Sequence, residues 1–235
     1  RVVVEEFLKG VEMSVFVLMD GKNYVILPEA KDYKRIGEKD TGPNTGGMGA
    51  YSPAPVVTPE IHARVMREVI TPTLGGMAAA GTPYTGFLYA GLMIDKAGNI
   101  KVLEFNCRMG DPETQPIILR LKTDLVELIE AAIDGRLDQV EAHWDRRCAL
   151  GVVLAARNYP DEPRKGDAIG GLDKGGDDYH VFHAGTAAEG EKIVTAGGRV
   201  LCVTALGEKV GLAAERAYEV VAGIEFAGRQ FRRDI

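Results

Sequence analysis

A carboxylate and an amide oxygen lie two residues apart in the segment Ile100-Lys-Val-Leu-Glu-Phe-Asn106. Because side chains alternate along a β-strand, Glu104 and Asn106 point to one face, and the apolar Leu103 and Phe105 point to the other. Two oxygen donors on one face suit a hard cation such as Mg²⁺, which completes its shell with water and nucleotide phosphate. The pair predicts a cation site, while a solvated polar face remains the simpler explanation of these two residues alone.

A dense polar turn follows the same segment, in the sequence Cys107-Arg-Met-Gly-Asp-Pro-Glu-Thr-Gln115. Gly110 and Pro112 shape this turn. A strand that leads into a polar turn and then a helix is a common location for a functional site. The turn therefore favours a site over an ordinary amphipathic strand.

The loop Gly42-Pro-Asn-Thr-Gly-Gly-Met-Gly49 is a second candidate site. Its four glycines would let backbone N–H groups approach an anion closely. The pattern is neither a P-loop nor G-x-G-x-x-G. Just upstream, Lys31, Lys34 and Arg35 supply three cations within five residues, which suits a phosphate. The alternatives are a flexible surface loop and a solvated run of charges.

A third candidate lies near the start of the sequence. The segment Glu5-Glu-Phe-Leu8 ends an expected strand, and Glu12 follows four residues later. The backbone edge could pair with a purine base, and Glu12 could then reach a ribose hydroxyl. By itself this signal is weak.

Hydrophobic patterns and turn residues predict the elements that position these candidates. Strands are expected over residues 2–8, 12–19, 24–27, 85–95, 100–106, 149–156, 179–184 and 199–205, with a hairpin joining the fourth to the fifth. Helices are expected from an N-cap at Thr58, near 117–121, from a cap at Thr123 to Gly135, and over 208–222. We expect Pro72 to kink or end the first helix. Residues 31–52 lack periodicity and predict a loop of about twenty residues.

Composition excludes several classes of protein. The chain has 235 residues, 46% of them hydrophobic, and a net charge of −6, so we expect a globular protein without a nucleic-acid partner. Its longest apolar stretch, residues 87–94, is far shorter than the roughly 18 residues of a membrane span, so no membrane partner is expected. The chain opens with Arg1 instead of Met, inside an expected strand, and we expect it to be a piece of a longer protein.

Cysteine and histidine spacing argues against a soft-metal site. Cys107, Cys148 and Cys202 lie far apart in the sequence and are odd in number, which favours a reducing cytoplasm over a disulfide framework. His180 and His183 form an H-x-x-H pair, but on a strand this spacing sends them to opposite faces.

Taken together, the motifs resemble the phosphoribosylamine–glycine ligase family (glycinamide ribonucleotide synthetases) of the ATP-grasp superfamily. The matching segments are Glu5-Glu-Phe-Leu-x-Gly-x-Glu12, Asp32-x-Lys-Arg35, Asp40-Thr-Gly-Pro-Asn-Thr-Gly-Gly-Met-Gly-Ala-Tyr-Ser-Pro53, Tyr84-Thr-Gly-Phe-Leu-Tyr-Ala-Gly-Leu92, Glu104-Phe-Asn-Cys-Arg108, Gly110-Asp-Pro-Glu-Thr-Gln-Pro116, Phe182-His-Ala-Gly-Thr186 and Gly197-Gly-Arg-Val-Leu-Cys-Val-Thr204. They cover essentially the whole chain in order.

The resemblance implies an α+β fold: the C-terminal part of an ATP-grasp domain over residues 1–140, with an antiparallel sheet and helices, and a small α+β C-terminal domain over 147–235. The N-terminal domain and the first half of the ATP-grasp domain would be missing, so the chain alone would be at best feebly active. A cytoplasmic enzyme is implied, and a monomer is plausible.

The resemblance also implies the reaction and its residues. MgATP would phosphorylate glycine to glycyl phosphate, which the amine of 5-phosphoribosylamine attacks to give glycinamide ribonucleotide, ADP and phosphate. Glu104 and Asn106 match the family's Mg²⁺ or Mn²⁺ ligands, and Arg108 and Asp111 are the candidate catalytic residues. The implied ATP-binding residues are Glu5, Leu8, Glu12 and Phe105, and the implied substrate-binding residues are Lys31, Asp32, Lys34, Arg35, Asn44, Thr45, Gly46, Gly47, Met48 and Gly49.

Two alternatives stay open. One is another ATP-grasp carboxylate–amine ligase with different substrates, against which the 42–49 loop and the basic segment before it argue. The other is a non-catalytic binding domain of the same fold. The polar set of Glu104, Asn106, Arg108 and Asp111 argues against that one, because nothing structural requires these groups together.

Overall fold

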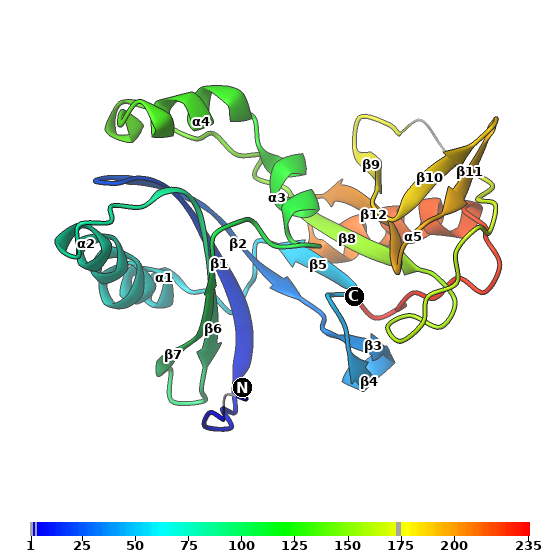
Figure 1. Ribbon diagram of the computed structural model, residues 1–235, viewed down its shortest axis with the longest axis horizontal. Helices are drawn as coiled ribbons and strands as arrows, with labels where there is room; N and C mark the ends of the chain where they lie inside the picture. Colours follow the sequence, from blue (N-terminus) through cyan, green and yellow to red (C-terminus); the bar gives the residue numbers. More distant parts are fainter. Residues whose placement is uncertain (1, 3, 173–174) are drawn as a thin grey trace. The chain divides into compact units, whose positions relative to one another are not determined.

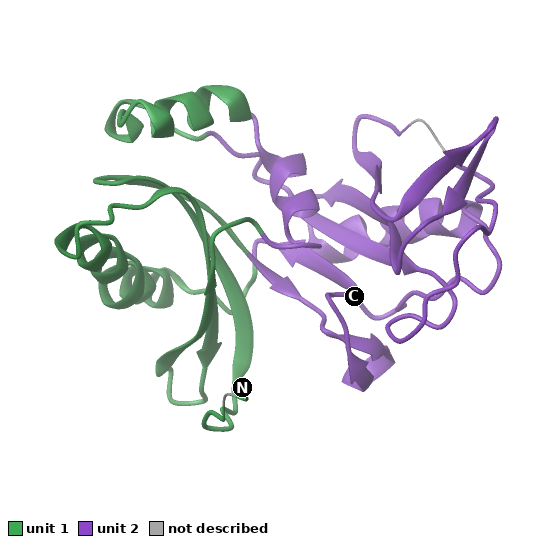
Figure 2. Cartoon of the chain, viewed as in Figure 1, with its two compact units in different colours: residues 1–29, 54–109, 123–142 green, residues 30–53, 110–122, 143–235 purple. Residues whose placement is uncertain are grey.

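Antiparallel strands dominate this chain, which the computed structural model describes at residue 2 and over residues 4–172 and 175–235 (Figure 1). The chain divides into two units, each assembled from segments far apart in the sequence (Figure 2). Unit 1 comprises residues 1–29, 54–109 and 123–142, and unit 2 comprises residues 30–53, 110–122 and 143–235.

Unit 1 is built on four antiparallel strands in the order β7, β6, β1, β2. They are β1 (Val11–Asp20), β2 (Tyr24–Asp32), β6 (Thr85–Ile94) and β7 (Ile100–Asn106), and the last three residues of β2 belong to unit 2. Alternate residues of β1, including Met13, Val15 and Val17, pack in one cluster with the helical segment 59–79. Helix α4 (Leu125–Ile133) also contacts β1 and β6. Strand β1 is therefore buried along almost its whole length.

The helical segment begins as its sequence predicts. It consists of α1 (Pro59–Val65), the π-turn η2 (Met66–Ile70) and α2 (Thr71–Ala79). The Thr58 hydroxyl accepts a hydrogen bond from the N–H of Ile61, and Pro59 occupies the first turn, which confirms the expected cap. Pro72 neither ends the segment nor breaks it, because it lies in the first turn of α2 directly after the π-turn.

Unit 2 contains the end of β2 and four further strands in the order β5, β8, β12, β9. They are β5 (Gly49–Ser52), β8 (Cys148–Ala155), β9 (Tyr179–His183) and β12 (Arg199–Gly207). Helix α5 (Val210–Gly223) packs its small residues Ala213 and Ala217 against β8 and β12 to form the core. Helix α3 (Thr114–Arg120) contacts the same two strands. This antiparallel sheet with helices agrees with the α+β class expected from the sequence.

Two short hairpins complete unit 2. Strands β3 (Arg35–Gly37) and β4 (Thr41–Asn44) pair around the 3-10 turn η1 (Glu38–Asp40), and β10 (Thr186–Glu189) pairs with β11 (Lys192–Thr195). The sequence did not predict β10 and β11, because their four-residue runs carry little periodicity. In unit 1, the 3-10 turn η3 (Leu137–Gln139) follows α4.

Three expectations were wrong. Residues 2 and 4–9 form no strand, and Val3 lies outside the described residues, so apolar content alone misled the prediction. The expected loop over 31–52 instead contains β3, η1, β4 and β5, whose short pairings are set by contacts distant in the sequence. Helix α4 is capped by Asp124, whose carboxylate accepts from the N–H of Val126, and not by Thr123.

Within the described part of the chain, no helix is long and apolar enough to span a membrane.

Candidate active site

Strand β7 places the two candidate cation ligands side by side. The amide Nδ2 of Asn106 donates to Oε1 of Glu104 over 3.0 Å, so the two side chains share a face as their spacing predicts. Glu104 lies opposite Gly91 of β6. A Cβ atom at Gly91 would lie 3.2 Å from Cγ of Glu104 and 3.1 Å from the Tyr89 ring, so the glycine leaves room for the carboxylate.

The donor set fits a cation that takes most of its ligands from elsewhere. Glu104 is exposed, and turning the Asn106 amide by 180° would bring its oxygen beside the carboxylate. Over the described residues, no cluster of three or more His, Cys, Asp or Glu side chains could hold a metal ion. Two oxygens on an open face match Mg²⁺, which keeps several waters and bridges to phosphate, better than a metal caged by protein ligands.

Tyr89 and Ser14 support this face, and the sequence did not single them out. The Ser14 hydroxyl donates to the Tyr89 hydroxyl over 3.1 Å, and Phe16 packs edge-on against the same ring with centroids 5.2 Å apart. The guanidinium of Arg108 lies over the ring at 5.8 Å and donates to its neighbour's carbonyl at Met109. The buried tyrosine therefore gives the exposed Arg108 a preferred orientation.

Two of the candidate nucleotide residues, Glu5 and Leu8, lie beside β7. A hollow of about 210 Å³ is lined by Glu5, Glu6, Leu8, Lys101, Val102 and Leu103. Lys101 of β7 pairs with Glu6 across 2.7 Å, which fixes the irregular segment against the strand. Glu12 is the second residue of β1 and lies opposite Met93 of β6, and Phe105 lies opposite Ala90 with 44% of its surface exposed. The structure thus brings Glu5 and Leu8 together, and it places Phe105 on the face opposite Glu104.

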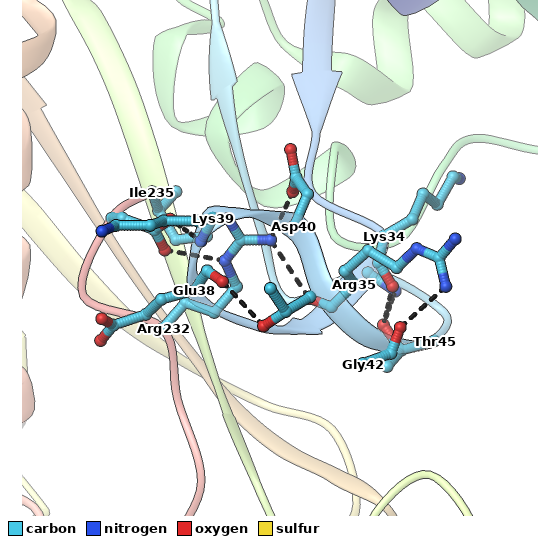
Figure 3. Close-up of polar contacts among 12 residues, drawn as sticks. Lys34, Arg35, Glu38, Lys39, Asp40, Gly42, Thr45, Arg232 and Ile235 are labelled. Carbon is cyan, nitrogen blue, oxygen red and sulfur yellow. Dashed lines mark hydrogen bonds and ion pairs between the residues drawn. The ribbon is translucent and has the colours of Figure 1, made fainter.

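In unit 2, most of the basic candidates are held by defined partners (Figure 3). Lys34 forms an ion pair of 2.6 Å with the buried Asp32. The backbone carbonyl of Lys34 accepts hydrogen bonds from both the N–H and the hydroxyl of Thr45. Arg35 donates to the carbonyl of Gly42 over 2.7 Å. Lys31 lies over the Tyr33 ring at 4.9 Å. The charges are thus fixed on a framework and are not a freely solvated run.

Arg232 anchors the β3–β4 hairpin, which begins at Arg35. Its guanidinium, which is 1% exposed, donates to both oxygens of Asp234, to Asp40 and to the carbonyl of Arg35 (Figure 3). Lys39 and Asp40 have φ values of 55° and 53°, a left-handed conformation that non-glycine residues adopt rarely. Asp234 also accepts from the N–H of Lys39, so this ion-pair cluster maintains the unusual turn.

We expect unit 2 to lose stability in acid through two aspartates. Hydrogen bonding to Arg232 lowers the pKa of Asp234 to about 2, and bonding to Arg147 holds the pKa of Asp145 well below its usual range. A carboxyl group with a depressed pKa stabilises the fold above its ordinary pKa of about 3.9, and this contribution is lost as the pH falls further. The melting temperature, measured between pH 6 and pH 2, should therefore fall steeply below pH 4. In an R232M variant the melting temperature should fall less over the same range. An equal fall in R232M would contradict the assignment of this effect to Asp234.

The glycine-rich loop is not an open anion cradle. The N–H groups of Thr45, Gly46, Gly47 and Met48 donate to protein acceptors, in order the Lys34 carbonyl, the Tyr159 hydroxyl, the Thr45 hydroxyl and the Tyr33 carbonyl. The glycines serve close packing instead. A Cβ atom at Gly47 would lie 2.4 Å from Cδ of Pro112, and one at Gly49 would lie 2.6 Å from the Gly151 carbonyl. The expected approach of these N–H groups to an anion is therefore corrected.

Asp111 lies against this loop and contacts a residue that the sequence did not single out. Its carboxylate accepts from Nε2 of Gln115 and from the Arg199 guanidinium, each over 3.0 Å. Arg199 begins β12 and also donates to the carbonyls of Asp111 and Gly46. It lies within the matched segment Gly197–Thr204, which was the signal available for finding it.

The antiparallel sheet and the comparisons with known proteins define an ATP-grasp protein. Biotin carboxylase from Campylobacter jejuni matches with a TM-score of 0.69 at 12% identity, covering 97% of this chain and 48% of that one, a likeness of fold alone. The family model described as phosphoribosylglycinamide synthetase, ATP-grasp (A) domain, matches residues 1–114, and the C-domain model of the same family matches residues 149–235. The chain belongs to the phosphoribosylglycinamide synthetase family.

Individual relatives agree with this assignment. Phosphoribosylamine–glycine ligases from Ralstonia nicotianae and Vibrio vulnificus are 60% and 62% identical over the whole of this chain, which covers 56% and 55% of their lengths. The crystal structure of phosphoribosylamine–glycine ligase from Thermotoga maritima has a TM-score of 0.89 at 40% identity, covering 98% of this chain and 57% of that one. The chain thus spans about half the length of the relatives it matches.

Proposed function

We propose that this chain carries the cation ligands and substrate-binding residues of an ATP-dependent ligase that joins glycine to 5-phosphoribosylamine. The products are glycinamide ribonucleotide, ADP and phosphate, a step of purine biosynthesis. One observation carries the proposal: identity of about 60% with phosphoribosylamine–glycine ligases extends over all of its motifs. The side-by-side placement of Glu104 and Asn106 supports it, because this pair suits a nucleotide-bound divalent cation.

In unit 1, we assign the cation to the face of β7 that carries Glu104 and Asn106, and the nucleotide to strand β7 and the hollow beside it. Glu104 and Asn106 hold Mg²⁺ or Mn²⁺, which offsets the charge of the nucleotide phosphates when bound. The backbone at Glu5 and Leu8 pairs with adenine, Glu12 holds the ribose hydroxyls, and Phe105 supplies apolar contact. The hollow of about 210 Å³ lined by Glu5 and Leu8 supports the adenine assignment.

In unit 2, we assign glycine and phosphoribosylamine to the basic segment 31–35 and the packed 42–49 loop. The side chains of Lys31, Lys34 and Arg35 supply positive charge for the ribose phosphate, with Asp32 orienting Lys34 through their ion pair. The loop residues Asn44, Thr45, Gly46, Gly47, Met48 and Gly49 shape the site. Since their N–H groups from Thr45 to Met48 bind protein acceptors, this loop contributes shape and carbonyl oxygens.

The reaction needs charge stabilisation more than general-base chemistry. A carboxylate oxygen of glycine attacks the γ-phosphorus of ATP, and the bond from that phosphorus to ADP breaks. The amine of phosphoribosylamine then attacks the carbonyl carbon of glycyl phosphate, and the carbon–oxygen bond breaks to release phosphate. We assign one residue to each step. In the first step, Arg108 offsets the negative charge of the transferring phosphoryl group, and in the second, Asp111 orients the attacking amine.

We further propose residues 1–140 as the ATP-grasp portion and residues 147–235 as the C-terminal domain. A cytoplasmic location is proposed from the three cysteines, Cys107, Cys148 and Cys202, which are all free thiols.

Oxygen labelling tests the proposed reaction. The protein for this test is a hybrid in which the 235-residue chain replaces the matched 56% of the Ralstonia nicotianae ligase. Glycine carrying ¹⁸O in its carboxylate should transfer one labelled oxygen to phosphate for each glycinamide ribonucleotide formed, because the bridging oxygen of glycyl phosphate comes from glycine. Turnover that releases unlabelled phosphate would exclude the acyl phosphate.

A further inference from the structure

Arg199 joins two segments that the sequence treats as separate motifs. Its Nη1 donates to the carbonyl of Gly46 over 2.9 Å and to that of Asp111 over 2.6 Å, and its Nη2 donates to the Asp111 carboxylate over 3.0 Å. One guanidinium thus bonds the 42–49 loop and the Asp111 turn at once. All of these residues belong to unit 2.

The loop is shaped to receive this side chain. A Cβ atom at Gly46 would lie 2.9 Å from Cζ and from Nη2 of Arg199, so the guanidinium lies flat against the glycine. The Gly46 N–H also donates to the hydroxyl of Tyr159 over 3.0 Å. A Cβ atom at Gly198, the residue before Arg199, would lie 2.4 Å from the same tyrosine ring. The N–H and the carbonyl of Gly46 are therefore each bonded to a residue of the C-terminal region.

The geometry of the Asp111 carboxylate is set by the same contact. Gln115 holds Oδ1 and Arg199 holds Oδ2, while the Asp111 side chain remains 54% exposed. A planar guanidinium that donates to a carboxylate and two carbonyls fixes orientation in a way that a lysine ammonium cannot reproduce. The exposed part of Asp111 is thus presented in one orientation.

We propose that Arg199 is a positioning residue that locks Asp111 and the 42–49 loop to one another, so that the C-terminal region contributes to the reaction and does not only pack beside it. The expected effect of Arg199 on the reaction rate rests on the proposed function. Its expected effect on the rigidity of the 42–49 loop rests only on the contacts described above. A displacement of about 1 Å in a reacting group can cost about 10²-fold in rate.

The structural consequence can be measured without any activity. In the 235-residue chain, hydrogen–deuterium exchange of amides 45–48 should become at least tenfold faster in R199A. R229A is the matched control, because Arg229 is another partly buried arginine of unit 2 that donates to a backbone carbonyl, at Val221. Unchanged exchange in R199A, or an equal change in R229A, would overturn the clamp.

The kinetic consequence is measured in the hybrid with the Ralstonia nicotianae ligase. R199A should lower kcat about 10²-fold and leave KM for MgATP within twofold, because Arg199 contacts none of the proposed nucleotide residues. Guanidinium chloride should restore part of the activity of R199A, while sodium chloride at equal ionic strength should not. The positioning role would be overturned if kcat fell no more in R199A than in R229A. It would also be overturned if R199A had a lower melting temperature and guanidinium restored none of its activity. If the unsubstituted hybrid forms no ADP, the proposed function fails, and the exchange experiment still decides the clamp.

Discussion

Replacing Glu104 with glutamine should abolish most of the activity of the hybrid ligase. We expect kcat to fall at least about 10²-fold, because the neutral amide no longer offsets the charge of a divalent cation beside the transferring phosphoryl group. The substitution preserves the shape of the side chain and its space over Gly91, so the fold should be unchanged. Metal-dependent ATP binding by calorimetry should weaken in parallel, and raising the Mg²⁺ concentration should recover part of the rate.

The control for this prediction is E130Q, which removes a charge from the exposed face of α4 in the same unit. It should leave both nucleotide binding and kcat within about twofold, since exposed substitutions away from a site have small effects. If E104Q binds ATP with the same dependence on Mg²⁺ as the parent, then Glu104 does not hold the cation.

Replacing Gly47 with alanine should strongly destabilise unit 2. Gly47 has a φ of +121°, which residues with side chains rarely adopt, and an added Cβ would lie 2.4 Å from Cδ of Pro112. Backbone strain and overpacking each cost about 1–3 kcal/mol, so we expect the free energy of unfolding to fall by about 3 kcal/mol. Urea unfolding of the 235-residue chain, followed by circular dichroism, measures this change.

The control G76A makes the same glycine-to-alanine change and should raise the free energy of unfolding, where G47A should lower it. Gly76 lies in α2 with open space around its Cα, and alanine has the higher helix propensity. We expect G76A to stabilise the chain by about 1 kcal/mol. If G47A and G76A had equal effects on unfolding, the close packing of the loop against the Asp111–Pro112 turn would be wrong.

Local features of the fold follow from the sequence. The cap at Thr58, the hairpin of β6 and β7, and the shared face of Glu104 and Asn106 depend on neighbours within a few residues or on strand periodicity. Such signals are set by backbone geometry and turn chemistry, which the local sequence specifies. The shared face of Glu104 and Asn106 could therefore be predicted without the structure.

The contacts that hold the proposed substrate-binding segments could not be predicted in this way. Arg199 bonds a residue 88 positions away, and Arg232 bonds the carbonyl of Arg35 across 197 positions. Neither contact leaves a periodic pattern, and both arginines lie in segments that read as ordinary strand or terminus. The glycines of the 42–49 loop also gave a misleading signal, because a sequence shows that backbone space is needed but not whether an anion or a proline fills it.

The proposed reaction is tested by ADP formation in the hybrid ligase with MgATP, glycine and phosphoribosylamine, with glycine and phosphoribosylamine omitted in turn. We expect ADP only when both are present, with one glycinamide ribonucleotide formed per ADP. We also expect the 235-residue chain without the remainder of the ligase to be at best feebly active. ADP formation that is independent of glycine or of phosphoribosylamine, or that is faster with a different carboxylate and amine, would overturn the proposed reaction.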